Sequence, residues 1–82
     1  MKTPKGKEVF VFEKEKIYTI FHGKVGHWTI EDGELLSWSY LFMNVPSRVK
    51  YARLHKSWRG KEITDFSTLP EQVQKYVEQI SE

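Results

Sequence analysis

The sequence of 82 residues contains no cysteine. Disulfide bonds and thiolate metal sites are therefore excluded, and the chain suits a reducing compartment such as the cytoplasm. Long apolar runs are also absent, because the longest, residues 9–12 and 40–43, fall far short of the roughly 20 residues of a membrane-spanning helix. No apolar stretch follows the first lysines, as it would in a secretory signal. We expect a cytoplasmic protein that has no membrane partner.

Hydrophobic residues nevertheless make up 39% of the chain and aromatic residues 15%, which is enough to form a core. Eighty-two residues are room for one domain, so we expect a single domain over residues 1–82. Residues 1–7 contain Pro4 and Gly6 among polar neighbours, and this composition predicts a flexible arm. The sequence shows no internal repeat and carries no motif of a known family.

Three short segments in the first half of the chain predict β-strands, namely residues 8–13, 17–22 and 27–31. β-Branched and aromatic residues are frequent in these segments. In the first segment valines alternate with phenylalanines. Because successive side chains of a strand point to opposite faces, both faces of this strand could be covered.

Two turns are predicted between strands. The polar residues 13–16 predict the first turn. The Asp-Gly dipeptide at residues 32–33 predicts the second, because a type I′ hairpin turn needs positive φ at both central positions. Residues 34–43 would then form the returning strand of this hairpin.

The register of the second hairpin stays open. A two-residue turn pairs Ile30 with Leu35 and places Trp28 on the face opposite Trp38, whereas a three-residue loop places both tryptophans on one face. A slip of one residue exchanges the two faces, so the pattern alone does not decide. The two-residue register would put aromatic residues on both faces, and an exposed aromatic face would indicate a function.

The Pro-Ser pair at residues 46–47 breaks the last strand and could open a helix over residues 48–58. We favour a helix because three apolar residues would then form one stripe, made of Tyr51, Leu54 and Trp58. A strand is the alternative, with Val49 and Tyr51 alternating with polar neighbours. Either element would end at Gly60, and residues 62–65 predict a short edge strand.

The C-terminal helix, predicted over residues 70–80, has the clearest pattern. Thr68 and Glu71 have the spacing of a capping box. The apolar residues recur at helical spacing and form one stripe, made of Leu69, Val73, Tyr76, Val77 and Ile80. We therefore predict an α+β fold: a small antiparallel sheet or partly open barrel of three to five strands, packed by a C-terminal helix, with a second short helix in the 48–58 region.

The net charge of +2 hides a strong polarisation along the chain. Residues 1–24 carry six lysines against three glutamates, and residues 25–47 carry three acids without a lysine or arginine. Residues 48–61 carry six cations without an acid, whereas residues 62–82 carry one lysine against five acids. One segment is therefore strongly basic, and phosphate is the commonest anionic partner of such a surface.

We call residues 48–61 the basic segment, and it is our candidate nucleic-acid-binding region. Its cations could contact phosphates, its aromatic rings could stack on unpaired bases, and its histidine could add a donor. The predicted binding residues are Arg48, Lys50, Tyr51, Arg53, His55, Lys56, Trp58, Arg59 and Lys61. The alternative is a solvated helix face whose Leu54 and Trp58 pack in the core and whose charge is neutralised by the acidic residues 62–82.

Other residue types give no support to catalysis or to a metal site. The histidines His22, His27 and His55 lack the spacing of a metal motif, although the first two could approach each other across a turn. The acidic residues near 32–33 crowd a hairpin turn, and no serine lies in a nucleophile elbow. We expect a non-catalytic protein with no cofactor and no bound metal.

The sequence thus favours a small nucleic-acid-binding or regulatory protein that uses the basic segment, with DNA and RNA both open as partners. The alternative is a protein-interaction module, such as a small inhibitor or adaptor of viral or cellular origin, that uses an exposed aromatic sheet face or edge. An unpaired sheet edge could also pair across a homodimer. Binding by the first kind of protein should weaken steeply with salt, and binding by the second should not.

Overall fold

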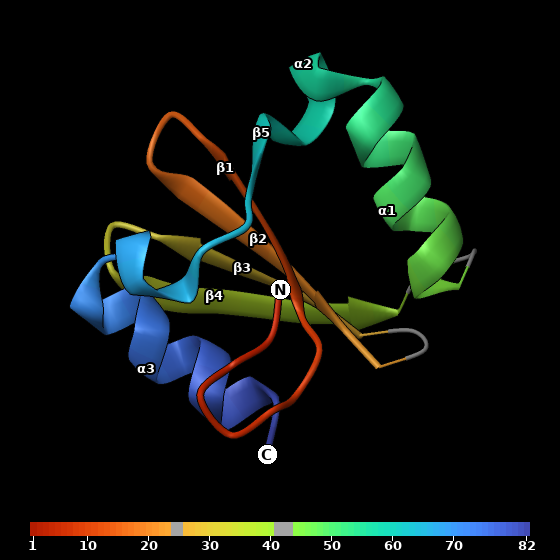
Figure 1. The fold of residues 1–82 in the computed structure, drawn as a ribbon. Helices are drawn as coiled ribbons and strands as arrows, with labels where there is room; N and C mark the ends of the chain where they lie inside the picture. Colours follow the sequence, from red (N-terminus) through yellow and green to blue (C-terminus); the bar gives the residue numbers. More distant parts are fainter. Residues whose placement is uncertain (24–25, 41–43) are drawn as a thin grey trace.

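The computed structural model describes residues 1–23, 26–40 and 44–82 of the chain. A single antiparallel sheet is flanked by helices (Figure 1). Its strands are β1 (Phe10–Lys14), β2 (Ile17–His22), β3 (Gly26–Glu31), β4 (Glu34–Tyr40) and β5 (Lys61–Ile63). The helices are α1 (Val45–Leu54), α2 (Lys56–Arg59), the 3₁₀-helix η1 (Phe66–Thr68) and α3 (Glu71–Ile80). The predicted α+β class with a C-terminal helix is confirmed.

The sheet is open and has the strand order β4-β3-β2-β1-β5, with every neighbouring pair antiparallel. Strands β1 to β4 form a meander, and β5 returns from the helices to pair with the outer side of β1. The predicted strands are confirmed with small shifts of their ends. The last three residues of the predicted fourth strand, 41–43, lie outside the described residues.

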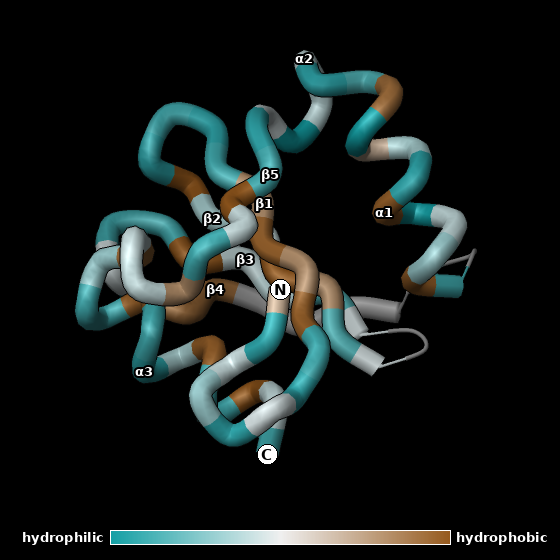
Figure 2. The backbone as a smooth tube through the Cα atoms, viewed as in Figure 1, coloured by the Kyte–Doolittle hydropathy of each residue, from teal (hydrophilic) through white to brown (hydrophobic). Residues whose placement is uncertain are grey.

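The alternation of valine and phenylalanine in and just before β1 gives the sheet two covered faces. Val9 and Val11 belong to a core cluster on the face that carries α3, and Phe12 belongs to a second cluster on the face that carries α1. Figure 1 shows α3 and the α1–α2 pair on opposite sides of the sheet. Figure 2 shows hydrophobic positions along the central strands and hydrophilic ones at the turns.

Helix α3 packs on its face of the sheet through the predicted stripe, in which Leu69, Val73 and Val77 are buried. The predicted capping box is wrong. Thr68 belongs to η1, where its hydroxyl donates to the carbonyl oxygen of Asp65 at 2.7 Å, and Pro70 occupies the N-cap position of α3. The 3₁₀ turn directly before the helix therefore uses the threonine that the pattern assigned to the cap.

The helix predicted for residues 48–58 is confirmed, and the strand alternative is wrong. Helix α1 begins earlier than predicted, because the side chain of Asn44 caps it by accepting from the backbone amide of Ser47 at 3.0 Å. The backbone leaves helical geometry at His55, where φ is −116° and ψ is 72°, and this break separates α1 from α2.

Of the apolar stripe predicted for this helix, Trp58 is partly buried against the core, whereas Tyr51 and Leu54 are not buried. Leu54 is 71% exposed and Tyr51 is 42% exposed. The buried face consists of small residues at spacings of four and three, namely Val45, Val49 and Ala52. These side chains pack against a pair of phenylalanine rings from β1 and β2, whose centroids lie 5.8 Å apart. Small residues allow the helix to approach these large rings closely.

The second hairpin follows one of the two proposed registers next to its turn and the other farther from the turn. Asp32 and Gly33 have positive φ, and Ile30 pairs with Leu35, as a two-residue turn requires. A bulge next to Thr29 then shifts the pairing by one residue, so that Trp28 pairs with Trp38. Beyond the bulge, the backbone therefore has the register that a three-residue loop would give.

The N-terminal residues 1–7 contact the sheet rather than extending from it. Thr3 is buried, and the terminal ammonium of Met1 donates to the carbonyl oxygen of Val9 at 2.7 Å. The same ammonium lies 3.3 Å from the carboxylate of Glu8. The predicted flexibility of this segment in solution stays a prediction.

Candidate nucleic-acid interface

The basic segment covers one face of the sheet, and most of the acidic C-terminal region lies on the other. It spans most of α1, all of α2 and the first residue of β5. The following acids mostly belong to η1 and α3 or their ends, which pack on the opposite face (Figure 1). Among the described ion pairs, the predicted neutralisation of the basic segment is limited to Glu62. The sheet therefore separates the basic segment from most of the C-terminal acids.

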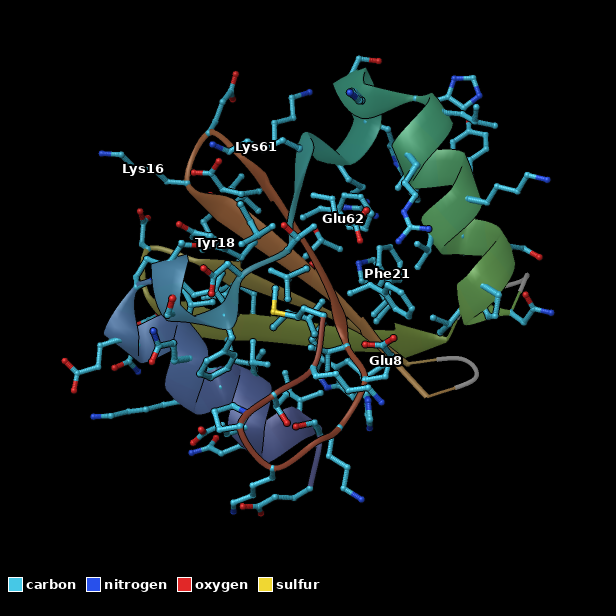
Figure 3. All side chains as sticks on the ribbon, viewed as in Figure 1. Glu8, Lys16, Tyr18, Phe21, Lys61 and Glu62 are labelled. Atoms are coloured by element: carbon cyan, nitrogen blue, oxygen red, sulfur yellow. The ribbon has the colours of Figure 1, made fainter. Side chains whose placement is uncertain are left out.

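Arg53 is the basic residue that makes this ion pair. Its Nε and Nη2 donate to the two carboxylate oxygens of Glu62 on β5 at 2.7 and 2.9 Å. Its guanidinium carbon also lies 5.7 Å from the centroid of the Phe10 ring. The hydrogen bond that Arg53 donates to Glu62 raises the pKa of Arg53. Figure 3 shows Glu62 in the space between β5 and α1, where the pair connects the helix to the sheet.

Trp58 lies under the two remaining arginines of the basic segment. The guanidinium carbon of Arg59 lies 4.3 Å from the centroid of the Trp58 ring, and that of Arg48 lies 5.4 Å from it. The ring of Tyr51 meets the same indole edge-on, with centroids 5.2 Å apart. Trp58 is therefore engaged within the fold by two cation–π contacts and one aromatic contact.

Only some residues of the basic segment have exposed side chains that make no ion pair among the described residues. Lys50, Lys56 and Lys61 are exposed, and they make none of the ion pairs found among the described residues. Tyr51 is 42% exposed and lies beside the exposed ring of His55, with ring centroids 4.3 Å apart. Of the two predicted stacking residues, Tyr51 is thus the one whose ring is more available.

The structure adds Lys14 to this face, which the sequence analysis did not include. Its Nζ donates to the carbonyl oxygen of Ser57 in α2, 43 residues along the chain. The contact depends on how α2 folds back on the β1–β2 hairpin, and no local pattern indicates it. Figure 3 shows Lys16, in the turn of this hairpin, at the same end of the sheet as Lys61 on β5.

A pocket of about 220 Å³ opens between this hairpin and α2. Its walls are Lys14, Glu15, Ile17, Thr19, Trp58 and Arg59. Thr19 is buried, whereas Lys14 and Glu15 are exposed at the rim. The pocket therefore has a polar floor and places a lysine and an arginine at one opening.

His27 lies on the same face of the sheet as α1, close to the arginine pair. Its ring stacks on that of Phe21 with centroids 5.3 Å apart, and Figure 3 shows Phe21 between the sheet and α1. Burial, followed by the charges of Arg59 and Arg48, lowers the pKa of His27 to about 4. Burial and then the charge of Arg48 also lower the pKa of Arg59. Positive charges thus gather here and repel one another.

The histidines do not assemble a metal site within the described parts of the chain. His22 and His27 occupy positions of opposite parity along the β2–β3 pairing, so they lie on different faces of the sheet. The ring of His22 lies 3.2 Å from the carbonyl oxygen of Glu8 instead. In the described ranges, no three side chains of histidine, cysteine, aspartate or glutamate gather in one place.

Over residues 1–23, 26–40 and 44–82, no helix combines the length and the apolar character that crossing a membrane requires. The chain has no match among protein-family models, curated proteins or solved structures.

Proposed function

We propose that this protein binds nucleic acid without catalysing a reaction, through the basic segment on the α1–α2 face. The observation that carries the proposal is the separation of charge by the sheet, with the basic segment on one face and α3 with its acids on the other. A nearly neutral protein that concentrates positive charge on one face presents a strong local potential to a polyanion.

The exposed lysines Lys50, Lys56 and Lys61 are the expected phosphate contacts. The adjoining rings of Tyr51 and His55 are the expected stacking surface for a base. Stacking needs an unpaired base, so this pair of rings favours a single strand over a duplex. Arg53 contributes less to binding than the sequence suggests, because Glu62 already holds its guanidinium.

The proposal is tested by fluorescence anisotropy with single-stranded and duplex oligonucleotides over a range of salt concentrations. With three lysines on a single strand, the slope of log K against log salt should be about −2. The variant Lys50→Gln/Lys56→Gln/Lys61→Gln should weaken binding roughly tenfold or more near 0.1 M salt and flatten this slope.

The matched control removes the same charge from outside the α1–α2 face, as Lys2→Gln/Lys7→Gln/Lys75→Gln, three lysines that are also exposed. It should retain most of the affinity. Equal losses in the two triple variants would mean that only net charge matters and would contradict a defined binding face.

A protein-interaction module, for instance a small inhibitor or adaptor, is the second candidate. It is favoured by the exposure of Leu54, which is 71% exposed and lies one helical turn from the exposed Tyr51. Binding through this apolar pair should change little with salt, and Leu54→Ser should abolish it. In nucleic-acid binding, the same substitution should have almost no effect.

A further inference from the structure

Two arginines of the basic segment lie against one aromatic ring. Arg48 comes from the first half of α1 and Arg59 from the end of α2, and the guanidinium carbons of both lie within 5.4 Å of the Trp58 ring centroid. Neither takes part in the ion pairs found among the described residues. We propose that Arg48 and Arg59, held against Trp58, form a binding site for one phosphate group.

The positive charges of Arg48 and Arg59 lie near each other, and a negative charge between them would be favourable. The guanidinium of Arg48 is near enough to lower the pKa of Arg59, and both arginines lower the pKa of His27. Repulsion of this kind costs free energy, and partial burial increases the cost because less water screens the charges. An anion bound between the cations would replace repulsion with attraction. The fold therefore holds in place a cluster that a bound anion stabilises.

The hydrogen-bond donors of the two arginines also favour a bound anion. The Nε atoms of Arg48 and Arg59 are both buried, and neither has a hydrogen-bond acceptor among the described residues. A buried donor without an acceptor is unfavourable, and most such groups in proteins are paired. Because Nε forms one prong of the guanidinium fork, the forks of both arginines still have capacity for an oxyanion.

The presence of two guanidinium groups favours one class of anion. A carboxylate offers two oxygens in one plane, which one guanidinium fork already satisfies, as Glu62 does for Arg53. A phosphate group has oxygens in a tetrahedral arrangement and can accept from two forks in different planes. The adjoining pocket, lined by Lys14, Thr19 and Arg59 with Glu15 at its rim, gives room for the group that carries the phosphate.

The inference rests on the proposed nucleic-acid function for the source of the phosphate, which is either an internal backbone phosphate or a terminal one. The site itself is testable without nucleic acid. The first experiment follows the Nε–Hε signals of the arginines by NMR while inorganic phosphate is added to the unmodified protein, with chloride at equal ionic strength as the control. Saturable shifts at Arg48 and Arg59, but not at Arg53, are expected. The absence of such shifts, or equal shifts with chloride, would overturn the proposal.

A second experiment uses Arg48→Lys/Arg59→Lys, which keeps both charges but removes both forks. Affinity for a single-stranded oligonucleotide should fall at least fivefold, while Lys7→Arg/Lys75→Arg, which alters two exposed lysines outside the α1–α2 face without changing charge, should bind as the parent does. Unchanged affinity in the arginine-to-lysine variant would contradict the site.

Comparing 5′-phosphorylated and 5′-hydroxyl oligonucleotides then assigns the source. A preference for the phosphorylated end that disappears in the variant assigns the site to a terminal phosphate, and equal losses with both oligonucleotides assign it to the backbone. If no oligonucleotide binds but inorganic phosphate still shifts both arginine signals, the proposed function fails and the phosphate site stands.

Discussion

The guanidinium of Arg53 on α1 donates to both carboxylate oxygens of Glu62 on β5, at 2.7 and 2.9 Å. This two-bond contact joins the helix to an edge strand and pairs one of the six cations of the basic segment with an acid. Glu62 is also the first acid after the basic segment, and its carboxylate moderates the charge of the α1–α2 face by pairing with Arg53.

Replacing that carboxylate should strengthen nucleic-acid binding. Glu62→Gln removes one negative charge and releases Arg53, which adds about one phosphate contact, so the salt slope for a single strand should steepen by about 0.7. Stability should fall by only about 0.2–1 kcal/mol, because Arg53 is more than half exposed. Anisotropy titrations measure the first effect and urea unfolding the second. Glu78→Gln, which removes a charge from α3, is the control, and an equal gain in this variant would contradict the role of Glu62.

His27 should make the stability of the protein depend on pH. Its pKa is about 4 in the folded protein, below the ordinary value of 6.5, chiefly because of burial. Between pH 4 and pH 6.5 the unfolded chain binds the proton of this histidine and the folded protein does not. The stability that neutral His27 gives to the folded protein is therefore complete above pH 6.5 and is lost as pH falls toward 4. We expect a loss of about 1–2 kcal/mol, discounted because the ring is only half buried.

Denaturant unfolding at several pH values measures this contribution as the difference between the parent protein and His27→Gln. The parent should lose more stability than the variant between pH 6.5 and 4. His55→Gln, which removes an exposed histidine at the α1–α2 junction, is the matched control. Parallel pH profiles for the parent and His27→Gln would contradict the assignment.

Substitutions in the β1–β2 turn should increase the stability of the protein. Glu15 and Lys16 have φ of 52° and 66°, a left-handed conformation that is unfavourable for residues with a side chain. Asn-Gly is preferred at such a turn, so Glu15→Asn/Lys16→Gly should stabilise the protein by about 1 kcal/mol. Thermal unfolding measures the change. Asp32→Asn, in a turn that already contains glycine, should change stability by less than about 0.5 kcal/mol.

Gly60 should not tolerate a side chain. Its φ is 84°, and a Cβ atom at this position would overlap with the carbonyl oxygen of Glu13. Gly60→Ala should therefore destabilise the protein by more than the roughly 1–3 kcal/mol of backbone strain alone. Gly23→Ala separates the backbone strain from the overlap, because φ is 72° there but no atom of the described residues lies within 4 Å of the added Cβ. Equal destabilisation by the two substitutions, measured by urea unfolding, would show that the overlap has no consequence.

Local periodicity was sufficient to predict the strands and the packing of α3. Leu69, Val73 and Val77 recur at one face of one helix, and their burial follows directly from that spacing. The same reasoning failed for α1, where Tyr51 and Leu54 of the predicted apolar stripe are exposed. Packing against the phenylalanine rings selects the smaller Val49 and Ala52 instead, and sequence alone does not contain the shape of that surface.

The sequence predicted which segment of the candidate site is charged, but not how its side chains are arranged in space. The bulge beside Thr29 and the break at His55 are tertiary features that no dipeptide signals, and the second redirects α2 toward the sheet. The contact of Lys14 with α2 and the meeting of Arg48 and Arg59 at one ring depend on that change of direction. The count of charges along the chain therefore predicted the basic segment. The structure divides its cations into those that contact other side chains and those that are exposed.

The proposed function requires nucleic acid to bind the α1–α2 face and not the α3 face. The most direct measurement is a map of backbone amide shifts by NMR during titration with a single-stranded oligonucleotide at low salt. We expect saturable shifts confined to α1, α2, the start of β5 and the neighbouring β1–β2 turn, with α3 unchanged. Shifts centred on α3 or on the β4 edge, or no shifts at all, would contradict it.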